Sequence, residues 1–361
     1  MGEVSKLPII GWADITPEWM TDMLRGAGYD ATVGEVTGKR VGTGQVGESV
    51  RFRLSYRGDA KGAPSTVVGK FPSPDPESRA PGVNFGNYIR EVNFYRYLAD
   101  SAGLTTPVCH YTDVDPVTSD FVLIMEDLGP AVPGDQIRGT SIAEAALVLE
   151  EAAKFHASHW NDDAMDEIPW LFETAAAPKR TEADFIVTLW KGFRERYGSR
   201  IPADCMEIGE ALMRNYGHFK AYDGPRCLTH NDFRPDNMMF GTAQGGYPVS
   251  VVDWQSIGYG CCMADVSYFL SGALKREERR AHEETLLTTY HRRLGELGVT
   301  GYSFEEMMKH YALYSFSLFN MAFTASMIVE RTERGDNMFF QMLRGGADHV
   351  LDTGALSLLP D

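Results

Sequence analysis

The first third of the chain alternates apolar and polar residues in the way that is typical of β-strands. Three such runs, each ended by Gly, Asp or Pro, predict an antiparallel meander over 31–41, 48–56 and 66–71. Two more strands are expected over 108–114 and 121–125. A short helix should precede them, because Thr16 can cap it, Pro17 suits its first turn and Gly26 or Gly28 can end it. A second helix is expected over 88–102, where apolar residues recur at three-residue steps.

The pattern becomes mainly helical after Met125, because residues 126–130 form a polar break that contains Gly and Pro. Ser141 and Glu144 have the spacing of a capping box at the start of a strong helical pattern, 141–160. Further helical patterns, interrupted by two short β-like segments, cover 183–197, 203–218, 264–273, 276–297 and 303–329. The sequence therefore predicts an N-terminal lobe of residues 1–126 and a mainly helical C-terminal lobe of residues 127–361.

Charge and composition exclude several classes of partner. A net charge of −16 argues against binding to nucleic acid, because the phosphate backbone rewards an excess of Lys and Arg. No stretch approaches the ~18 continuous apolar residues of a membrane span, so we expect no membrane insertion. The five cysteines are odd in number and include no C-x-x-C pair, which favours a reducing cytoplasm.

The segment 227–240 carries the strongest chemical signal. His230 lies two residues before Asp232, and Asn237 lies five residues after it. Phosphoryl transfer needs a carboxylate that accepts the proton of a hydroxyl group, with oxygen ligands for Mg²⁺ beside it. Asp232 fits the first role and Asn237 the second. The alternative is a polar turn, in which Asp and Asn are common residues.

A second candidate metal ligand stands at the end of an apolar run, 248–252. Asp253 follows this run directly. Because a strand end holds a carboxylate rigidly, we expect Asp253 to be the principal Mg²⁺ ligand, with Asn237 in support. Taken alone, such an Asp is more often an ordinary turn or cap residue. The nearby segment 227–240 favours the metal-binding role.

Gly42, Gly44 and Gly47 form a G-x-G-x-x-G pattern between two predicted strands. Glycine lets the backbone approach phosphate groups, whose oxygens can then accept hydrogen bonds from backbone N–H groups. The pattern alone is weak, because Gly-rich hairpins are common. A dinucleotide-binding site would require a helix directly after the glycines. A strand follows instead, which disfavours a dinucleotide-binding site.

Lys70 lies within an apolar strand, and Glu91 lies early on the helix that follows. A Lys on a buried strand is costly unless it is paired. Kinases use such a Lys to hold the α- and β-phosphates, and a helix Glu to position it. The alternative is a solvent-facing Lys on an edge strand with an exposed Glu. The other motifs favour the kinase-like pairing.

The glycine pattern, the strand Lys, the helix Glu, the polar break, the segment 227–240 and the Asp after a strand follow one another along the chain. In residue type and in order, they resemble the protein-kinase-like fold. Asn231 between His230 and Asp232, and Trp254 after Asp253 in place of D-F-G, resemble the aminoglycoside phosphotransferase and choline kinase branch. The resemblance covers nearly the whole chain. It implies an α+β fold of two lobes, with ATP or GTP and Mg²⁺ in the cleft between them and a small-molecule hydroxyl group as the acceptor.

Within that branch, residues 230–237 look most like the phosphotransferase domains that precede some acyl-CoA dehydrogenases. Residues 70–73 and 90–97 are similar to ecdysteroid-kinase-like proteins. Both resemblances imply a lipid, acyl-CoA or steroid-like acceptor. An antibiotic phosphotransferase, for aminoglycosides or macrolides, is the alternative within the family.

The resemblance also implies roles for other residues. Arg234 would face the transferring phosphoryl group, or else pair locally with Asp236. His230 would brace the loop, and Asp265 would accept hydrogen bonds from its backbone. Glu126 and Leu128 would contact the nucleotide base through their main chains. Asn231 replaces the usual Gly, a substitution that is tolerable if the backbone there is left-handed, because Asn adopts that conformation more readily than most residues.

The sequence is also compatible with two other classes of protein. One is a non-catalytic nucleotide-binding protein that keeps the fold, although every expected catalytic residue type is present. The other is a protein kinase, which is weakened by the sequence Asp253-Trp254-Gln255 and by the lack of a recognisable A-P-E segment.

Overall fold

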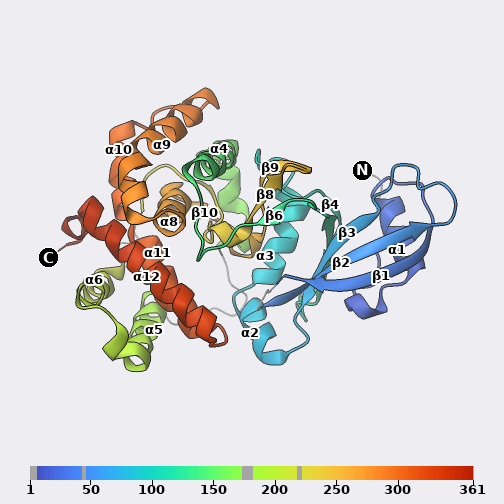
Figure 1. Cartoon of the computed structure of the whole chain (residues 1–361), viewed down its shortest axis with the longest axis horizontal. Helices are drawn as coiled ribbons and strands as arrows, with labels where there is room; N and C mark the ends of the chain where they lie inside the picture. The colour runs from blue at the N-terminus through green and yellow to red at the C-terminus, as the bar shows by residue number, and fades with distance from the viewer. Residues whose placement is uncertain (1–5, 43–45, 173–181, 218–221, 361) are drawn as a thin grey trace.

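The computed structural model describes residues 6–42, 46–172, 182–217 and 222–360. A five-stranded sheet forms the centre of the N-terminal part, and a larger, mainly helical part follows (Figure 1). The expected α+β fold of two lobes is therefore confirmed. The boundary between residues 126 and 127 stays a prediction, and the last strand of the sheet ends at Glu126.

Neighbouring strands of the sheet are antiparallel, in the order β1-β2-β3-β5-β4. Their bounds lie within two residues of the predicted runs: β1 (Val33–Val41), β2 (Gly47–Tyr56), β3 (Thr66–Pro72), β4 (Cys109–Val114) and β5 (Phe121–Glu126). Burial alternates along much of β2, as expected for a sheet with one covered face. The predicted meander of the first three strands is confirmed.

Helix α1 (Pro17–Gly26) begins and ends where the sequence predicts. The Thr16 side chain accepts a hydrogen bond from the Trp19 N–H and caps the helix. Met20, Met23 and Leu24 are fully buried in a cluster with apolar side chains of the sheet. This packing fixes α1 against the N-terminal sheet.

The predicted helix over 88–102 is confirmed over 88–98, but it changes type within that range and is wrong over 99–102. An α-helix, α3 (Asn87–Asn93), continues as a π-helix over Phe94–Leu98. The wider turn is closed by the Ala99 N–H, which donates to the Phe94 carbonyl. A preceding helix, α2 (Pro76–Asn84), was not predicted, because it contains Pro81 and has no apolar stripe.

The helical part contains the expected elements and two corrections. Helix α4 carries the predicted capping box at Ser141 and Glu144. The pattern over 303–329 is divided at Ser315 into two helices, and a long final helix, α12, was not predicted. The α-helices are α4 (Ile142–Ser158), α5 (Glu182–Tyr197), α6 (Ala203–Arg214), α8 (Met263–Ala273), α9 (Arg276–Glu296), α10 (Phe304–Leu313), α11 (Phe316–Ile328) and α12 (Glu333–Thr353).

Short strands between these helices carry the loops of the candidate site. They are β6 (Val132–Pro133), β7 (Cys227–Thr229), β8 (Met238–Thr242), β9 (Gly245–Val251) and β10 (Gly258–Gly260). β7 pairs with β10, and β8 pairs with both β6 and β9. Because β7 pairs with β10 and β8 pairs with β9, the loop from β7 to β8, which carries Asp232, lies beside the loop from β9 to β10, which carries Asp253.

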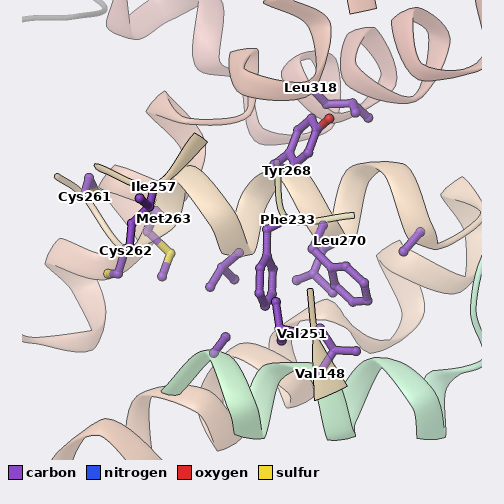
Figure 2. Packing of buried hydrophobic residues seen from close by; sticks show 14 of the residues in the cluster. Val148, Phe233, Val251, Ile257, Cys261, Cys262, Met263, Tyr268, Leu270 and Leu318 are labelled. Carbon is purple, nitrogen blue, oxygen red and sulfur yellow. The ribbon is translucent and has the colours of Figure 1, made fainter. Parts of the chain in front are cut away.

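The main core spans both parts of the chain. It joins side chains of α3 and β5 to those of α4, α8 and α11. Figure 2 shows Phe233, which follows the catalytic Asp candidate, packed between α8 residues and Val148 of α4. The loop that carries Asp232 is thus anchored in densely packed apolar surroundings. In the part of the chain that the structure describes, no helix is long and apolar enough to cross a membrane.

Candidate active site

The loop after β7 is held in place by one buried carboxylate. Asp265, on α8, is fully buried and accepts hydrogen bonds from the backbone N–H groups of His230 at 2.7 Å and Asn231 at 2.8 Å. Asn231 has φ of 62°, so the backbone is left-handed there, the condition under which Asn can replace Gly. His230 donates from Nε2 to the Val252 carbonyl at 3.0 Å. The bracing roles expected for His230 and Asp265 are confirmed.

Replacing Asp265 with Asn is expected to destabilise the protein by about 2–3 kcal/mol, because the amide nitrogen would face a backbone N–H and leave it unsatisfied. The measurement is urea unfolding followed by circular dichroism. The control is Asp30→Asn, which removes a carboxylate that pairs with Lys61 on the surface. Equal losses in the two variants would contradict the anchoring role.

Asp232 is surrounded by hydrogen-bond donors. Asn237 Nδ2 donates to its Oδ2 at 2.9 Å, and the Tyr268 hydroxyl donates to its Oδ1 at 3.0 Å. Arg234 Nε lies 3.1 Å from Oδ1. These donors fix the carboxylate on the cavity wall. A carboxylate held in this way can aim a hydroxyl group and accept its proton.

Tyr268 was not identified from the sequence. It leaves α8 on the side that faces Leu318 of α11 (Figure 2). Burial raises the pKa of Tyr268 well above its usual value, and the Asp232 carboxylate adds to the rise. The phenol therefore stays a donor to Asp232. Its spacing of three residues from Asp265, on the same helix, was the signal that could have found it.

Arg234 makes both of the local contacts available to it. Its Nη1 lies 2.7 Å from Asp236 Oδ2, and its Nε lies close to Asp232. Burial lowers its pKa, but Asp232, Tyr268 and Asp236 more than offset this, so the pKa is raised. The expected pairing with Asp236 is present. The guanidinium also lines the cavity, where it can face an anionic group.

One ion-pair network joins the two lobes. Lys70 Nζ, on β3, lies 2.6 Å from Glu91 Oε1 on α3 and 2.9 Å from Asp253 Oδ1. Burial lowers the pKa of Lys70, but the Asp253 and Glu91 carboxylates outweigh it and raise the pKa. Burial raises the pKa of Asp253, but Lys70 brings it below its usual value. Lys70 is therefore a cation and Asp253 an anion. The predicted pair of Lys70 and Glu91 is confirmed.

Asp253 and Asn237 fit the ligand requirements of Mg²⁺. The Val252 N–H donates to the Asn237 carbonyl at 3.0 Å, which brings the two residues side by side. The Asn237 amide nitrogen is committed to Asp232, so its Oδ1 is the atom available to a metal. Asp253 has a left-handed φ of 70°, an uncommon conformation that occurs at functional sites.

Among the described residues, no group of three or more His, Cys, Asp and Glu side chains could hold a metal ion. A purely protein-built metal cage is therefore not seen in the described parts of the chain. Mg²⁺ commonly has only one or two carboxylate ligands and completes its shell with water and phosphate oxygens. The pair formed by Asp253 and Asn237 suits that kind of site.

Two of the three predicted glycines line the cavity. Gly42 has φ of 77°, which favours glycine. A Cβ on Gly47 would lie 2.9 Å from the Phe71 carbonyl oxygen, so this glycine is required for the approach of β2 to β3. Gly44 lies outside the described residues.

The segment after β5 also reaches the cavity, through Glu126 and Leu128. The Glu126 N–H donates to the Val108 carbonyl, and its carboxylate accepts from the Tyr247 hydroxyl. The Leu128 carbonyl accepts from the Ala131 N–H. The Leu128 N–H has no hydrogen bond to any described residue, which leaves it available to a nucleotide base.

The predicted site residues that the structure describes face a continuous cavity of about 2170 Å³. It runs from the glycine hairpin and the end of β5, past Asp253 and Asp232, to the walls formed by α11 and α12. The structure thus brings together every predicted site residue that it describes. A cavity of this size can hold a nucleotide and a second molecule, and the reacting groups lie between the two ends.

Comparisons with known proteins bear on the family and the fold of the chain. A family model described as the phosphotransferase enzyme family matches residues 45–302. A candidate aminoglycoside phosphotransferase from Ralstonia eutropha superimposes with a TM-score of 0.54 and 15% identity, over 96% of this chain and 98% of that chain. Aminoglycoside 2′-phosphotransferase-IIIa, in its GDP complex, gives a TM-score of 0.50 and 12% identity, over 88% and 94% of the two chains.

An ethanolamine kinase from Plasmodium vivax aligns over 88% of this chain and 81% of its own, with a TM-score of 0.49 and 10% identity. The comparison with curated proteins gave no match. At such low identities, the likeness to the first two structures shows the fold alone.

Proposed function

Because the chain belongs to the phosphotransferase enzyme family, we propose that it is a small-molecule kinase that transfers the γ-phosphoryl group of ATP or GTP to a hydroxyl group. One observation carries the proposal. Lys70 lies between Glu91 and Asp253 in a network that links the two lobes across the cavity, with Asp232 on the same cavity wall. A cation for phosphate, a carboxylate for a metal and a carboxylate for a proton are the groups that phosphoryl transfer needs.

The nucleotide would lie at the end of the cavity formed by the first lobe. Gly42 and Gly47 would cover its phosphates, Lys70 would bind them, and Glu91 would keep Lys70 in position. Glu126 and Leu128 would contact the base through main-chain groups. The similar aminoglycoside 2′-phosphotransferase-IIIa is known as a GDP complex, which lends support to nucleotide binding here. A cytoplasmic location would supply the nucleotide, and the five free cysteines fit a reducing compartment.

At the other end, Asp232 would accept the proton of the acceptor hydroxyl. The oxygen would then form a bond to the γ-phosphorus, while the bond from that phosphorus to the bridging oxygen breaks and the nucleoside diphosphate leaves. Arg234 would stabilise the charge on the transferring group. When bound by Asp253 and Asn237, Mg²⁺ neutralises phosphate charge.

The test uses pure protein, Mg²⁺, isotopically labelled ATP or GTP and a small-molecule extract. Mass spectrometry should detect at least one labelled phosphate ester that the Asp232→Asn variant does not produce. Nucleotide binding without any product, for either nucleotide, would support a non-catalytic role. Labelling of an aminoglycoside or a macrolide would instead support antibiotic phosphorylation, and labelling of peptides would indicate a protein kinase.

A further inference from the structure

A second, smaller cavity lies in the N-terminal lobe. Its volume is about 380 Å³, within the range of roughly 300–1,000 Å³ that is usual for small-molecule sites. Its walls come from the segment after α1, the start of β3, the start of β4 and the end of β5. Two of its lining residues, Glu126 and Asp127, also line the main cavity. The smaller cavity therefore adjoins the segment that joins the two lobes.

The alternation of side chains along β5 directs Glu126 toward the smaller cavity. Leu123 and Met125 pack in the main core with residues of α3. Val122 and Ile124 pack on the other face of the sheet, in the cluster that contains residues of α1. Successive side chains of a strand point to opposite faces, so Glu126 continues the α1 side. Its carboxylate is therefore distinct from the main-chain groups that would contact a nucleotide base.

A β-bulge places a second functional group beside this carboxylate. The register of β4 on β5 shifts between Cys109 and Tyr111, so His110 is the additional residue. Bulges of this kind redirect a side chain. The His110 ring lies against the Tyr29 ring, with centroids 5.8 Å apart and planes at 72°. Burial lowers the pKa of His110 more than the Glu126 carboxylate raises it, so the ring is uncharged at neutral pH.

The Glu126 carboxylate is not balanced by a cation in the described part of the chain. It accepts hydrogen bonds from two uncharged donors, the Val108 N–H at 3.2 Å and the Tyr247 hydroxyl at 3.2 Å. A carboxylate can accept about four hydrogen bonds, so two further positions remain. The described lining residues include no Lys or Arg. The neighbouring Asp127, by contrast, lies 2.8 Å from Arg51 Nε.

These groups match the chemistry of an organic cation. Tyr29, His110 and Glu126 are each partly exposed, so a ligand can reach all three. An ammonium group can donate to a carboxylate and is attracted to the face of an aromatic ring. Val108, at 55% exposure, offers apolar surface for the remainder of the ligand. A metal ion does not fit, because no group of three or more suitable ligands is found among the described residues.

We propose that the smaller cavity is a second binding site, for a small organic ammonium ion that carries an apolar group. The ammonium group donates to the Glu126 carboxylate beside the Tyr29 ring, and the apolar group covers Val108. The proposal does not depend on the kinase function, because none of the proposed catalytic groups takes part. A ligand bound there contacts the side chain of Glu126, whose residue also lines the main cavity.

The test compares benzylammonium with benzyl alcohol, an uncharged ligand of nearly the same size, by NMR titration of the full chain. Benzylammonium should bind about tenfold more tightly than the alcohol. Glu126→Gln keeps an acceptor for the Val108 N–H but removes the charge, so it should abolish this preference and leave the affinity for the alcohol unchanged. Asp135→Asn removes a carboxylate of the main cavity and should leave both affinities unchanged.

A pair of substitutions at Tyr29 tests the aromatic wall independently of Glu126. Tyr29→Phe keeps the ring and should keep the affinity for benzylammonium, whereas Tyr29→Leu should lower it by about threefold to fivefold. Circular dichroism checks that each variant is folded. Three results would each overturn the proposed site: no binding of benzylammonium at millimolar concentration, equal affinities of the two ligands for the wild type, or a wild-type preference for benzylammonium in Glu126→Gln.

Discussion

Asp232→Asn is expected to lower the rate of phosphate transfer by about 10²–10⁴-fold, the usual contribution of a general base, while nucleotide affinity stays within about twofold. The amide keeps the size of the side chain but cannot accept the acceptor's proton. Single-turnover transfer from labelled nucleotide gives the rate, and equilibrium binding gives the affinity. Circular dichroism at the same concentration checks that the fold is retained.

Tyr268→Phe is the matched control for this variant. It removes one donor to Asp232 and leaves the carboxylate, so transfer should fall by much less than in Asp232→Asn. Retention of nearly full activity in Asp232→Asn would exclude proton acceptance by this residue. The reaction would then depend on positioning and charge alone.

Asp253→Asn should reduce transfer by about two to three orders of magnitude and raise the Mg²⁺ concentration needed for half-maximal rate. The change removes the only carboxylate of the proposed metal pair. It also removes one of the two anionic partners of Lys70. Because Lys70 keeps the pKa of Asp253 low, the wild-type carboxylate is ionised at neutral pH and available to the metal.

A Mg²⁺ titration of the transfer rate separates these effects. Asp135→Asn is the control, since Asp135 also lines the cavity but pairs with Arg334 and not with Lys70. Its Mg²⁺ dependence should equal that of the wild type. An unchanged Mg²⁺ dependence in Asp253→Asn would remove this residue from the metal site and leave it a partner of Lys70.

The proposed catalytic groups could be predicted from the sequence because some of them lie at short, recognisable spacings. Asp232 and Asn237 are five residues apart, and a single 3₁₀ turn, Pro235–Asn237, is enough to bring their side chains to 2.9 Å. Lys70 and Asp253 are 183 positions apart, and only the order of the motifs indicated that they meet. Site residues that are defined by their type and by short spacings can therefore be predicted from a single sequence.

The acceptor end of the cavity could not be predicted in this way. Its walls depend on which faces of separate helices meet, and no spacing encodes that. Helix α12 was missed although it is 21 residues long, since Gly345 and Gly346 weaken its helical signal. The structure gives the reason for these glycines: a Cβ on Gly346 would lie 2.5 Å from the Phe319 backbone nitrogen of α11. Close helix packing, rather than helix propensity, selected them.

The π-turn of Phe94–Leu98 links the two halves of the site mechanically. Phe94 stacks on Trp254 with ring centroids 3.9 Å apart, and Trp254 directly follows Asp253. Three residues before Phe94, Glu91 holds Lys70. A rotation of α3 would therefore displace Lys70 and Asp253 together. In the proposed kinase, opening of the cleft would separate its charged groups at the same time, so nucleotide exchange and loss of activity would both depend on α3.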